Sequence, residues 1–505
     1  MRSLGVDTYM MHAYFKKFVV ATVIFTIFLT SSFLLAANPI AIVLLEDSIL
    51  TSHILDEIIP LRLSFSETNH FFNKGITVEI QVSNPNATIF YTIDGSVPTL
   101  NSDEYCEPIY FELHPEVYSL VLRAIAIYEE YTTEPITHTY FIGESILERF
   151  APDIIVFALS TDPVNLFDHD VGILVDGRLR EEFIRDYPDV KILPWSVSDN
   201  FNMRDVGIVP WLAPSNYNQR GIEAERPVHV EAFTNMERVI SQAAGLRIHG
   251  GASRSLPQKS LRLIARRKYS PGAGQFHFDF FPDDFAYNGL PQIRNDSLNL
   301  RNGGNDWSGG MLRNELGVFL ARKAGLMAMP FRPAAIFLNG DYYGFAWLQV
   351  HISTQYLEDA FNAPTREFDI ISGGEQRFNI GHRDIDENAI ADLEFKNSFT
   401  YKNFNDDNVF AEFETIVDIN DLLLYYAFQI YWNNCDWPDN NLRRWRYTGE
   451  QTPYLAQELD GRWRYAVFDL DFGLGRYHHK NVAWEGSNRG TSIYKQFKVH
   501  KLASI

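Results

Sequence analysis

The sequence predicts an α+β protein in which a small antiparallel β-sandwich precedes a larger domain of mixed strands and helices. Short alternating apolar runs separated by turn residues occupy residues 72–142. Strand-like and helix-like segments then alternate from about residue 150 onward. The 505 residues are too many for one compact core, and the 46% hydrophobic content is ample for packed interiors.

Overall composition excludes some classes of function. The formal net charge of −20 argues against a general nucleic-acid binder, because an acidic surface repels phosphate groups. The two cysteines, Cys106 and Cys435, lie far apart in the sequence. They give no disulfide framework and cannot form a zinc site by themselves.

The N-terminal residues 1–45 predict a signal peptide or a membrane anchor. Lys16 and Lys17 precede an uncharged apolar run over residues 18–37, and acidic residues follow it. A run of roughly 20 apolar residues can span a bilayer. Basic residues on its N-terminal side favour export of the rest of the chain. Cleaved and uncleaved forms both fit, a buried helix is the alternative, and we expect an extracellular or surface-anchored protein.

Residues 68–143 predict the β-sandwich. ITVEIQV alternates, and ATIFYTIDGSVPT, YSLVLRAIAIY and THTYFIG follow at short intervals. Turn residues separate these runs, as is typical of small antiparallel sandwiches. Asp94 resembles a catalytic carboxylate, but an aspartate before Gly95 is more typical of a β-turn.

The first motif of the larger domain is LRIHGGASRSLPQKSLRLIARR, residues 246–267. It predicts two strands joined by a glycine-containing loop, with Lys259 directly before the second strand, Ser260 to Ala265. Glycines allow backbone N–H groups to approach an anion, and a lysine can neutralise phosphate charge. The candidate cofactor-binding residues in this segment are Gly250, Gly251, Ser253, Arg254 and Lys259. A protein kinase uses a glycine-rich hairpin and a strand lysine in the same way to bind the phosphates of ATP. The alternative interpretation is an ordinary hairpin with a solvated lysine.

The segment MLRNELGVFLARKAGL predicts a helix that follows this hairpin. Its apolar stripe consists of Leu312, Leu316, Phe319 and Leu320. Glu315 falls on the same face, and a carboxylate on a buried stripe needs a partner. We expect Glu315 to pair with Lys259, as in kinases, with Arg313 or a backbone group as alternatives. Next, AAIFLNGDYYGFAWLQV predicts a scaffold hairpin around the turn signal Asn339-Gly340.

The C-terminal motifs carry the most chemistry. DLLLYYAFQIYW predicts a helix with Asp421 or Asn420 as its N-cap, followed by a polar loop over residues 433–441. Two strands, LRRWRY and GRWRYAVFDLD, then lead into Phe472-Gly473. The order helix, Asp-x4-Asn loop, hairpin and Asp-Phe-Gly is that of a protein kinase.

This order assigns roles to four polar residues. Asp436 is the candidate catalytic carboxylate, which would orient or deprotonate an acceptor hydroxyl. Asn441, Asp469 and Asp471 are candidate ligands for Mg²⁺, which prefers oxygen donors. Regular alternation would place both later aspartates on one face, so that they converge with Asp436 on one cleft. The alternative is that the loop aspartates cap turns and that Asp469 pairs with an arginine.

Taken together, these segments resemble the CotH kinase family, the spore coat protein H-like proteins. The resemblance runs through most of residues 150–480 and includes NYNQRGIEAERPVHVEAF, LRNGGNDW, RNELGVFLARKAGL, NNCDWPDNN and FDLDFGLG. The sandwich is similar to the chitobiase C-terminal type, on the strength of YTIDGSVPT and LRAIAIY.

The resemblance implies an atypical protein-kinase-like fold over residues 150–505 that uses ATP and Mg²⁺. It implies phosphate transfer to Ser or Thr of surface or coat proteins. Lys259 would be the ATP lysine, Asp436 the catalytic aspartate, Asn441 the metal asparagine, and Asp469 or Asp471 the metal carboxylate. Relatives continue through further helices where this sequence stops soon after Gly475, so we expect a C-terminally truncated copy.

Two other functions remain open. One is a non-catalytic exported surface protein with a kinase-like scaffold, whose sandwich contacts glycan or cell wall. The other is a glycoside hydrolase, suggested only by the sandwich. Hydrolases need two carboxylates across a sugar cleft, and an appended sandwich is not a catalytic domain.

Overall fold

The computed structural model describes residues 61–116, 118–146, 150, 153–195, 207–282, 291–372, 379–380, 399, 402–434, 436–437, 441–452 and 455–474. The predicted signal peptide or anchor lies outside these residues. Within the described ranges, no helix combines the length and the apolar composition that crossing a bilayer requires.

The first folded part is the predicted antiparallel sandwich. A six-stranded sheet has the order β2-β10-β8-β5-β6, with β9 paired to β8, and two short sheets pair β1 with β4 and β3 with β7. The strands are β1 (Leu63–Phe65), β2 (Phe71–Phe72), β3 (Ile76–Val78), β4 (Ile80–Val82), β5 (Thr88–Thr92), β6 (Asp103–Glu104), β7 (Ile109–Phe111), β8 (Tyr118–Tyr128), β9 (Tyr131–Thr132) and β10 (Ile136–Ile142). Asp94 is a turn residue, because its Oδ1 accepts hydrogen bonds from the backbone and hydroxyl of Ser96.

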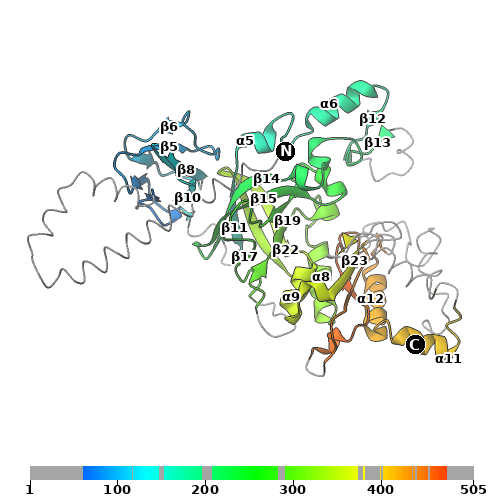
Figure 1. The fold of residues 1–505 in the computed structure, drawn as a ribbon. Helices are drawn as coiled ribbons and strands as arrows, with labels where there is room; N and C mark the ends of the chain where they lie inside the picture. The colour runs from blue at the N-terminus through cyan, green and yellow to red at the C-terminus, as the bar shows by residue number, and fades with distance from the viewer. Residues whose placement is uncertain are drawn as a thin grey trace, which may run out of the picture. The chain divides into compact units, whose positions relative to one another are not determined.

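Seven strands then close into a barrel with the order β11-β14-β15-β16-β19-β22-β21 (Figure 1). They are β11 (Ile155–Ser160), β14 (Arg226–Thr234), β15 (Glu237–His249), β16 (Ser260–Ile264), β19 (Ser297–Arg301), β21 (Phe331–Leu338) and β22 (Asp341–Val350). Neighbouring strands are antiparallel except β11 and β21, which are parallel.

Alternation along the barrel strands decides which side chains leave the core. On β16, Leu261 and Leu263 are fully buried in the barrel core. Ser260 and Arg262 alternate with them and therefore point to the other face of the strand. The predicted hairpin around Asn339-Gly340 is confirmed as the turn between β21 and β22. Both turn residues have positive φ, 50° and 91°, as a type I′ turn requires.

A second sheet has the order β20-β26-β25-β23-β24 and packs with two helices, α8 and α12. Its strands are β20 (Met327–Ala328), β23 (Phe368–Ser372), β24 (Asn379–Ile380), β25 (Arg443–Tyr447) and β26 (Arg464–Val467). The helix α12 (Ile419–Trp432) begins at Asp418, whose side chain accepts from the Asp421 amide, so neither predicted N-cap is correct. The carboxylate of Asp421 instead accepts from the backbone amide of Tyr465 on β26.

The helix α8 (Arg313–Lys323) buries a different face from the one its apolar stripe predicts. Leu312, Leu316, Phe319 and Leu320 are all exposed, whereas Asn314, Glu315, Gly317, Val318 and Ala321 are buried. Close approach is the physical reason. A Cβ on Gly317 would lie 2.6 Å from Leu470 and 2.8 Å from Trp432, so the helix docks through its small residues.

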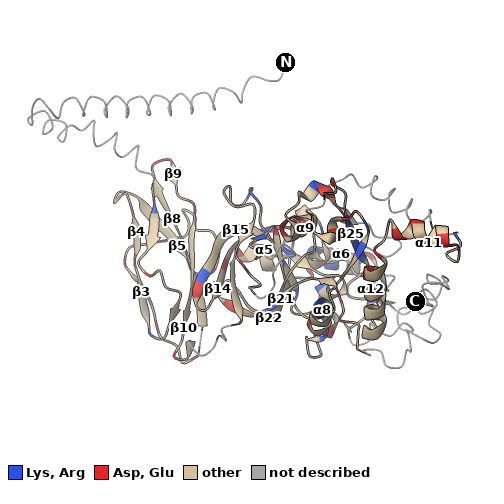
Figure 2. Cartoon of the chain, turned by 90° about the horizontal axis from the view of Figure 1, so that it is seen from below, with Lys and Arg blue, Asp and Glu red and all other residues tan. Residues whose placement is uncertain are grey.

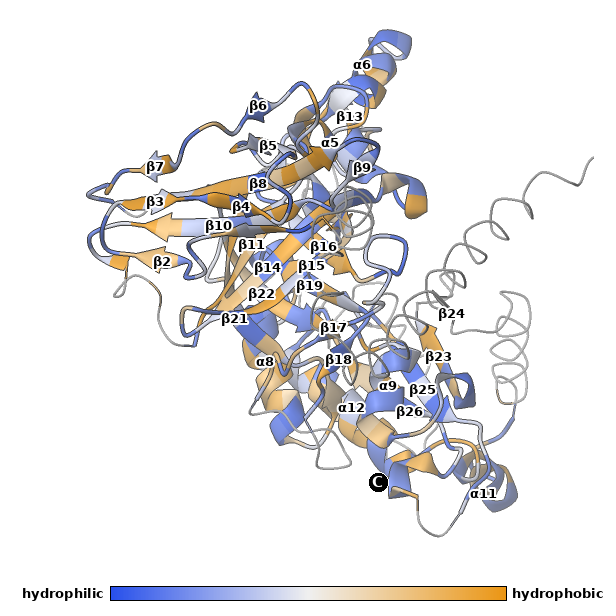
Figure 3. Ribbon diagram, turned by 60° about the vertical axis from the view of Figure 1, so that its left-hand side comes forward, coloured by the Kyte–Doolittle hydropathy of each residue, from blue (hydrophilic) through white to orange (hydrophobic). Residues whose placement is uncertain are grey.

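Several other helices lie at the surface of the described chain. The helix α6 (Gly177–Asp186) has no buried residue and is largely hydrophilic in Figure 3. The helix α11 (Asp407–Glu414) carries acidic residues, drawn in red in Figure 2, and begins at Asp406, which accepts from the Asn408 amide. The helix α9 (Thr354–Phe361) joins the end of β22 to β23. The architecture thus confirms the α+β class.

Candidate functional site

The structure brings Asp436, Asn441 and Asp469 together. The side-chain amide of Asn441 donates to Oδ2 of Asp436 over 3.1 Å and to the backbone carbonyl of Asp469 over 3.4 Å. Asn441 adopts a left-handed φ of 58°, which asparagine tolerates better than most residues. One amide therefore links the predicted catalytic loop to the predicted metal segment.

The end of α12 holds both segments in place. Asn433 caps the helix in the left-handed region. The indole of Trp432 donates to the carbonyl of Leu470 over 2.9 Å, and the Leu474 amide donates to the carbonyl of Trp432 over 2.9 Å. A Cβ on Gly473 would lie 2.0 Å from Nε1 of Trp432, so the glycine of Asp-Phe-Gly is needed for this approach.

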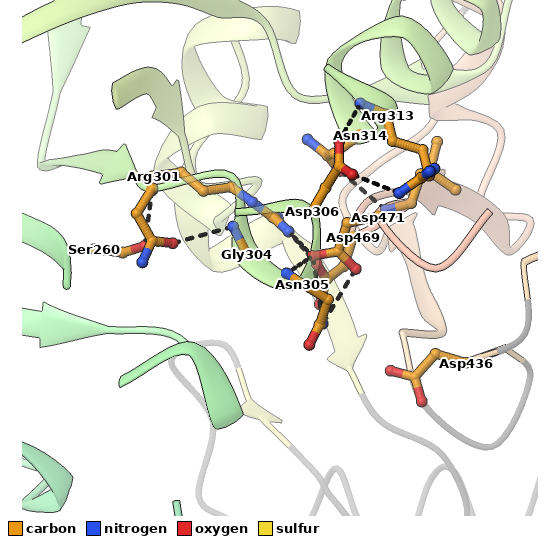
Figure 4. A network of polar contacts seen from close by, with 12 residues as sticks. Ser260, Arg301, Gly304, Asn305, Asp306, Arg313, Asn314, Asp436, Asp469 and Asp471 are labelled. Atoms are coloured by element: carbon orange, nitrogen blue, oxygen red, sulfur yellow. Dashed lines mark hydrogen bonds and ion pairs between the residues drawn. The ribbon is translucent and has the colours of Figure 1, made fainter. Parts of the chain in front are cut away.

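Both later aspartates contact the same arginine, as Figure 4 shows. Nη2 of Arg301, at the end of β19, donates to Oδ1 of Asp469 over 2.7 Å and also to Oδ2 of Asp471. The Asn305 amide donates to Oδ2 of Asp471 over 2.8 Å. The alternative in which Asp469 pairs with an arginine is therefore correct, and sequence reasoning missed Arg301.

The predicted alternation of Asp469 and Asp471 is wrong in its detail. The strand β26 ends at Val467, and Asp469 has a φ of 55°, so the extended pattern stops before either carboxylate. They still meet because a turn, rather than a strand, carries them past Arg301. Gly304 permits the contact, since a Cβ there would lie 2.2 Å from Oδ2 of Asp471.

Burial and the neighbouring charge of Asp469 raise the pKa of Asp471 to about 7, although Arg301 and Asn305 oppose the shift. Asp471 is only 1% exposed. Burial alone would lower the pKa of Arg301, but the two carboxylates reverse this and raise its pKa. The centre therefore holds one buried cation, Arg301, between two carboxylates.

Glu315 lies near this centre but does not pair with Lys259. Its Oε1 accepts from the side chains of Asn314 and Gln349, over 2.9 and 3.2 Å. Burial raises the pKa of Glu315, and the charge of Arg301 opposes the shift. Its buried Oε2 has no hydrogen-bond partner among the described residues. Arg313, the other predicted partner, pairs with Asp306 instead.

Lys259 directly precedes β16 and makes its contacts with residues outside the carboxylate centre. Its Nζ donates to the carbonyl of Leu256 over 3.0 Å and lies 4.1 Å from the ring centroid of Tyr217. Burial lowers the pKa of Lys259 to about 8. The expected pair with Glu315 is therefore wrong, and contact of Lys259 with a nucleotide stays a prediction.

The predicted glycine loop forms the connection between β15 and β16 and contains a short 3₁₀ helix, η4 (Ala252–Ser255). Gly250 has a φ of 103°, and a Cβ there would lie 2.4 Å from Oγ of Ser253. Arg254 is buried and donates to the carbonyls of Gly250, Tyr217 and Gln219. These contacts give Arg254 a structural role, while Gly251 has open space around its Cα.

Four arginines that the sequence reasoning did not identify lie around the end of this region, and two of them, Arg301 and Arg443, interact with Asp469. In each of these arginines one buried guanidinium nitrogen has no hydrogen-bond partner among the described residues: Nε of Arg247, Nε of Arg262, Nε of Arg301 and Nη1 of Arg443. Arg443 interacts electrostatically with both Arg262 and Asp469. We call Arg247, Arg262, Arg301 and Arg443 the arginine cluster. Unsatisfied buried donors are costly, so this cluster suits a bound anion.

The pattern LRIH and LRLIARR did contain a signal for the cluster. Arg247 and Arg262 each alternate with buried leucines, and they are directly opposite each other in the register of β15 and β16. Burial and the charges of Arg262 and Arg301 lower the pKa of the neighbouring His249 to about 3. A neutral histidine therefore adds no further charge.

The carboxylates fit a divalent cation in their chemistry. Two carboxylate oxygens already converge on one cationic nitrogen of Arg301. The carboxylates of Asp436, Asp469 and Asp471 can carry three negative charges, more than the single positive charge of Arg301. The Asp469 side chain is 34% exposed. In the described part of the chain, no group of three or more His, Cys, Asp or Glu residues could hold a metal alone. Asn441 and solvent would have to complete the coordination.

Comparison with known proteins agrees with this geometry. Residues 246–500 match the family described as CotH kinase protein, and residues 68–139 match the Chitobiase/beta-hexosaminidase C-terminal domain. A search of curated proteins finds no match. The first match covers half of the chain and contains every candidate site residue. The chain is therefore a member of the CotH kinase protein family, with a kinase-like domain preceded by a chitobiase-type sandwich.

Proposed function

We propose that the protein transfers the γ-phosphate of ATP to a Ser or Thr hydroxyl of surface or coat proteins. The observation that carries the proposal is the Asn441 amide, which bonds to both the Asp436 carboxylate and the Asp469 backbone. This contact joins an acceptor-binding carboxylate to a cation-binding segment. Phosphoryl transfer requires these two parts to be held together.

Each residue then has a chemical task. Asp436 orients the acceptor hydroxyl and accepts its proton, with Asn441 holding the carboxylate in position. Asp469, Asp471 and Asn441 would hold Mg²⁺, which neutralises the charge of the phosphates when bound. Asn305 and Gly304 keep Asp471 in place through the short contact with the loop after β19.

The arginine cluster is the proposed phosphate-binding element. Arg262 lies on β16, which begins directly after the expected ATP lysine, and it points away from the barrel core. Its Nη2 donates to Oγ of Ser297 over 2.9 Å, and its buried Nε has no hydrogen-bond partner among the described residues. Lys259 by contrast uses its only side-chain nitrogen on the carbonyl of Leu256 and lies over the ring of Tyr217. Guanidinium groups match phosphate oxygens with two donors at once.

A second function is favoured by a different observation. Arg301 forms ion pairs with both Asp469 and Asp471, as expected in a non-catalytic scaffold that binds no metal. In that case the protein would act through its surface, and the sandwich would contact glycan or cell wall. The two functions differ in whether Mg²⁺ and ATP bind at all.

Thermal unfolding of the purified full-length protein separates them. ATP with Mg²⁺ should raise the unfolding temperature, while each alone should have less effect, because a ligand that binds only the folded state stabilises it. Arg262→Met should remove the ATP-dependent shift. The matched control Arg366→Met alters an 81% exposed arginine and should leave the shift intact. No shift with ATP and Mg²⁺ would favour the scaffold.

We also propose that the chain is exported and is anchored or released at the cell surface. The support is the charge asymmetry around the apolar run at residues 18–37. A reporter that is active only outside the cytoplasm, fused after residue 60, should be active. An inactive reporter with the protein in the cytosolic fraction would contradict export.

A further inference from the structure

A cavity of about 720 Å³ lies beside the loop that follows β16. It is lined by Ile222, Ala265, Arg266, Arg267, Lys268, Gly272, Gly274, Gln275 and His277. Its volume falls within the range of pockets that hold ligands of several residues or rings. None of these residues belongs to the carboxylate centre or to the arginine cluster.

One buried carboxylate contacts two cations of the cavity wall, Arg266 and Lys268, together with Arg247, which belongs to the arginine cluster and does not line the cavity. The Glu225 side chain is fully buried, and its oxygens contact Arg247 at 2.6 Å, Arg266 at 2.9 Å and Lys268 at 3.1 Å. The Tyr269 hydroxyl also donates to Glu225. Three cations therefore share one negative charge, and the group keeps a net positive charge in a chain of net charge −20.

Close packing builds this arrangement into the fold. A Cβ on Gly245 would lie 2.6 Å from Cδ of Glu225, so the glycine leaves room for the carboxylate. Nζ of Lys268 is also held 4.4 Å from the ring centroid of Tyr269. Glycine at position 245 therefore leaves the space that the Glu225 side chain occupies when it contacts its cations.

The cations keep donors that Glu225 does not use. Arg266 contacts the carboxylate through Nε alone, which leaves the two Nη groups of its guanidinium. Lys268 uses one of its three N–H donors on Glu225. Arg267 is exposed on the cavity wall and forms no ion pair among the described residues. The cavity wall therefore carries N–H donors of Arg266, Arg267 and Lys268 that Glu225 does not occupy.

We infer that this cavity binds a phosphorylated Ser or Thr of the acceptor protein, together with the peptide around it. Clusters of arginine recognise phosphate groups through charge-assisted hydrogen bonds. The cavity is larger than one phosphate, and its other walls are uncharged residues such as Ile222, which is 52% exposed. The identity of the ligand rests on the proposed function, because the reaction product would then occupy the cavity and favour further phosphorylation of the same acceptor.

Fluorescence anisotropy of a short labelled phosphoserine peptide, without ATP or Mg²⁺, tests this inference on the full-length protein. The phosphopeptide should bind at least about tenfold more tightly than the same peptide with unmodified serine, a factor equivalent to one charge-assisted contact. The double variant Arg267→Gln and Lys268→Gln should lose this preference. Arg366→Gln, at an exposed arginine outside the cavity, should retain it.

A second variant separates a built site from unorganised positive charge. Glu225→Gln removes a negative charge, so simple attraction predicts tighter binding of the phosphopeptide. Our inference predicts weaker binding, because the cations lose the carboxylate that orients them. Tighter binding by Glu225→Gln would overturn the inference.

The controls assign the remaining outcomes. Equal affinity for inorganic phosphate and the phosphopeptide would overturn the peptide part, as would displacement of the peptide by ATP alone. If the wild-type protein shows no preference for the phosphopeptide but keeps the ATP–Mg²⁺ thermal shift, only the inference about this cavity is refuted. Absence of the thermal shift with intact peptide binding refutes only the proposed catalysis.

Discussion

Replacing Arg301 by methionine should destabilise the protein in a way that Mg²⁺ relieves. Asp471 is 1% exposed and would lose its charged partner, while Asp469 would remain beside it. Removing one member of a buried ion pair costs about 3–5 kcal/mol. Part of this cost disappears at low pH, because the pKa of Asp471 is already raised and the carboxyl can take up a proton. The measurement therefore belongs near pH 8.

Urea unfolding, followed by tryptophan fluorescence, gives the free energy of unfolding with and without Mg²⁺. Trp432 contacts the carbonyl of Leu470, so its emission should report on this centre. At 100 times its dissociation constant, Mg²⁺ should restore about 2.7 kcal/mol to the variant. The wild-type protein should gain less, because Arg301 already occupies the carboxylates.

Arg313→Met is the matched control. Arg313 pairs with the buried Asp306, but Asp306 keeps the backbone amides of Leu312 and Arg313 as donors. We expect a loss of about 1–3 kcal/mol that Mg²⁺ does not change. If Arg301→Met is as stable as the wild type, or if Mg²⁺ stabilises both variants equally, the account of the centre is wrong.

Three further predictions concern single residues. Because the pKa of Asp471 is raised, the folded protein keeps a proton that the unfolded chain loses between about pH 4 and pH 7. The free energy of unfolding should therefore fall as pH rises through this window. In unfolding measured at several pH values, Asp471→Asn should flatten this fall. Gly317→Val should cost about 1–3 kcal/mol in urea unfolding, because its side chain would overlap Leu470 and Trp432, whereas Gly251→Ala, with open space, should cost far less. Lys259→Met should retain ATP binding in a titration that Arg262→Met abolishes, and the reverse result would restore Lys259 as the ATP lysine.

Local signals predicted much of the fold. The Asn339-Gly340 turn, the strand order around Lys259 and the α12 helix followed by its polar loop depend on neighbouring residues, and all of them are present in the structure. The meeting of Asp436 with Asn441 also follows from one short loop. Such features need no knowledge of distant contacts.

Features set by tertiary packing were missed. The buried face of α8 is chosen by the close approach of Trp432 and Leu470 to Gly317, which its apolar stripe cannot reveal. Arg301 lies more than a hundred residues before the aspartates it contacts, and its motif gave no reason to pair them. Lys259 was assigned by its position in a hairpin, whereas its place over the Tyr217 ring depends on a residue that the hairpin motif does not contain.

The most direct test of the central claim is transfer of labelled γ-phosphate from ATP to protein hydroxyls. Wild-type protein with Mg²⁺ should label Ser or Thr residues of itself or of an added surface protein. Asp436→Asn should lose the label but keep the ATP–Mg²⁺ thermal shift, because it removes the proton acceptor and leaves the cation site. Asp439→Asn alters a neighbouring loop carboxylate and serves as the control. Equal labelling by wild type and Asp436→Asn, or no labelling by the wild type with any acceptor, would contradict the assignment of this centre as catalytic.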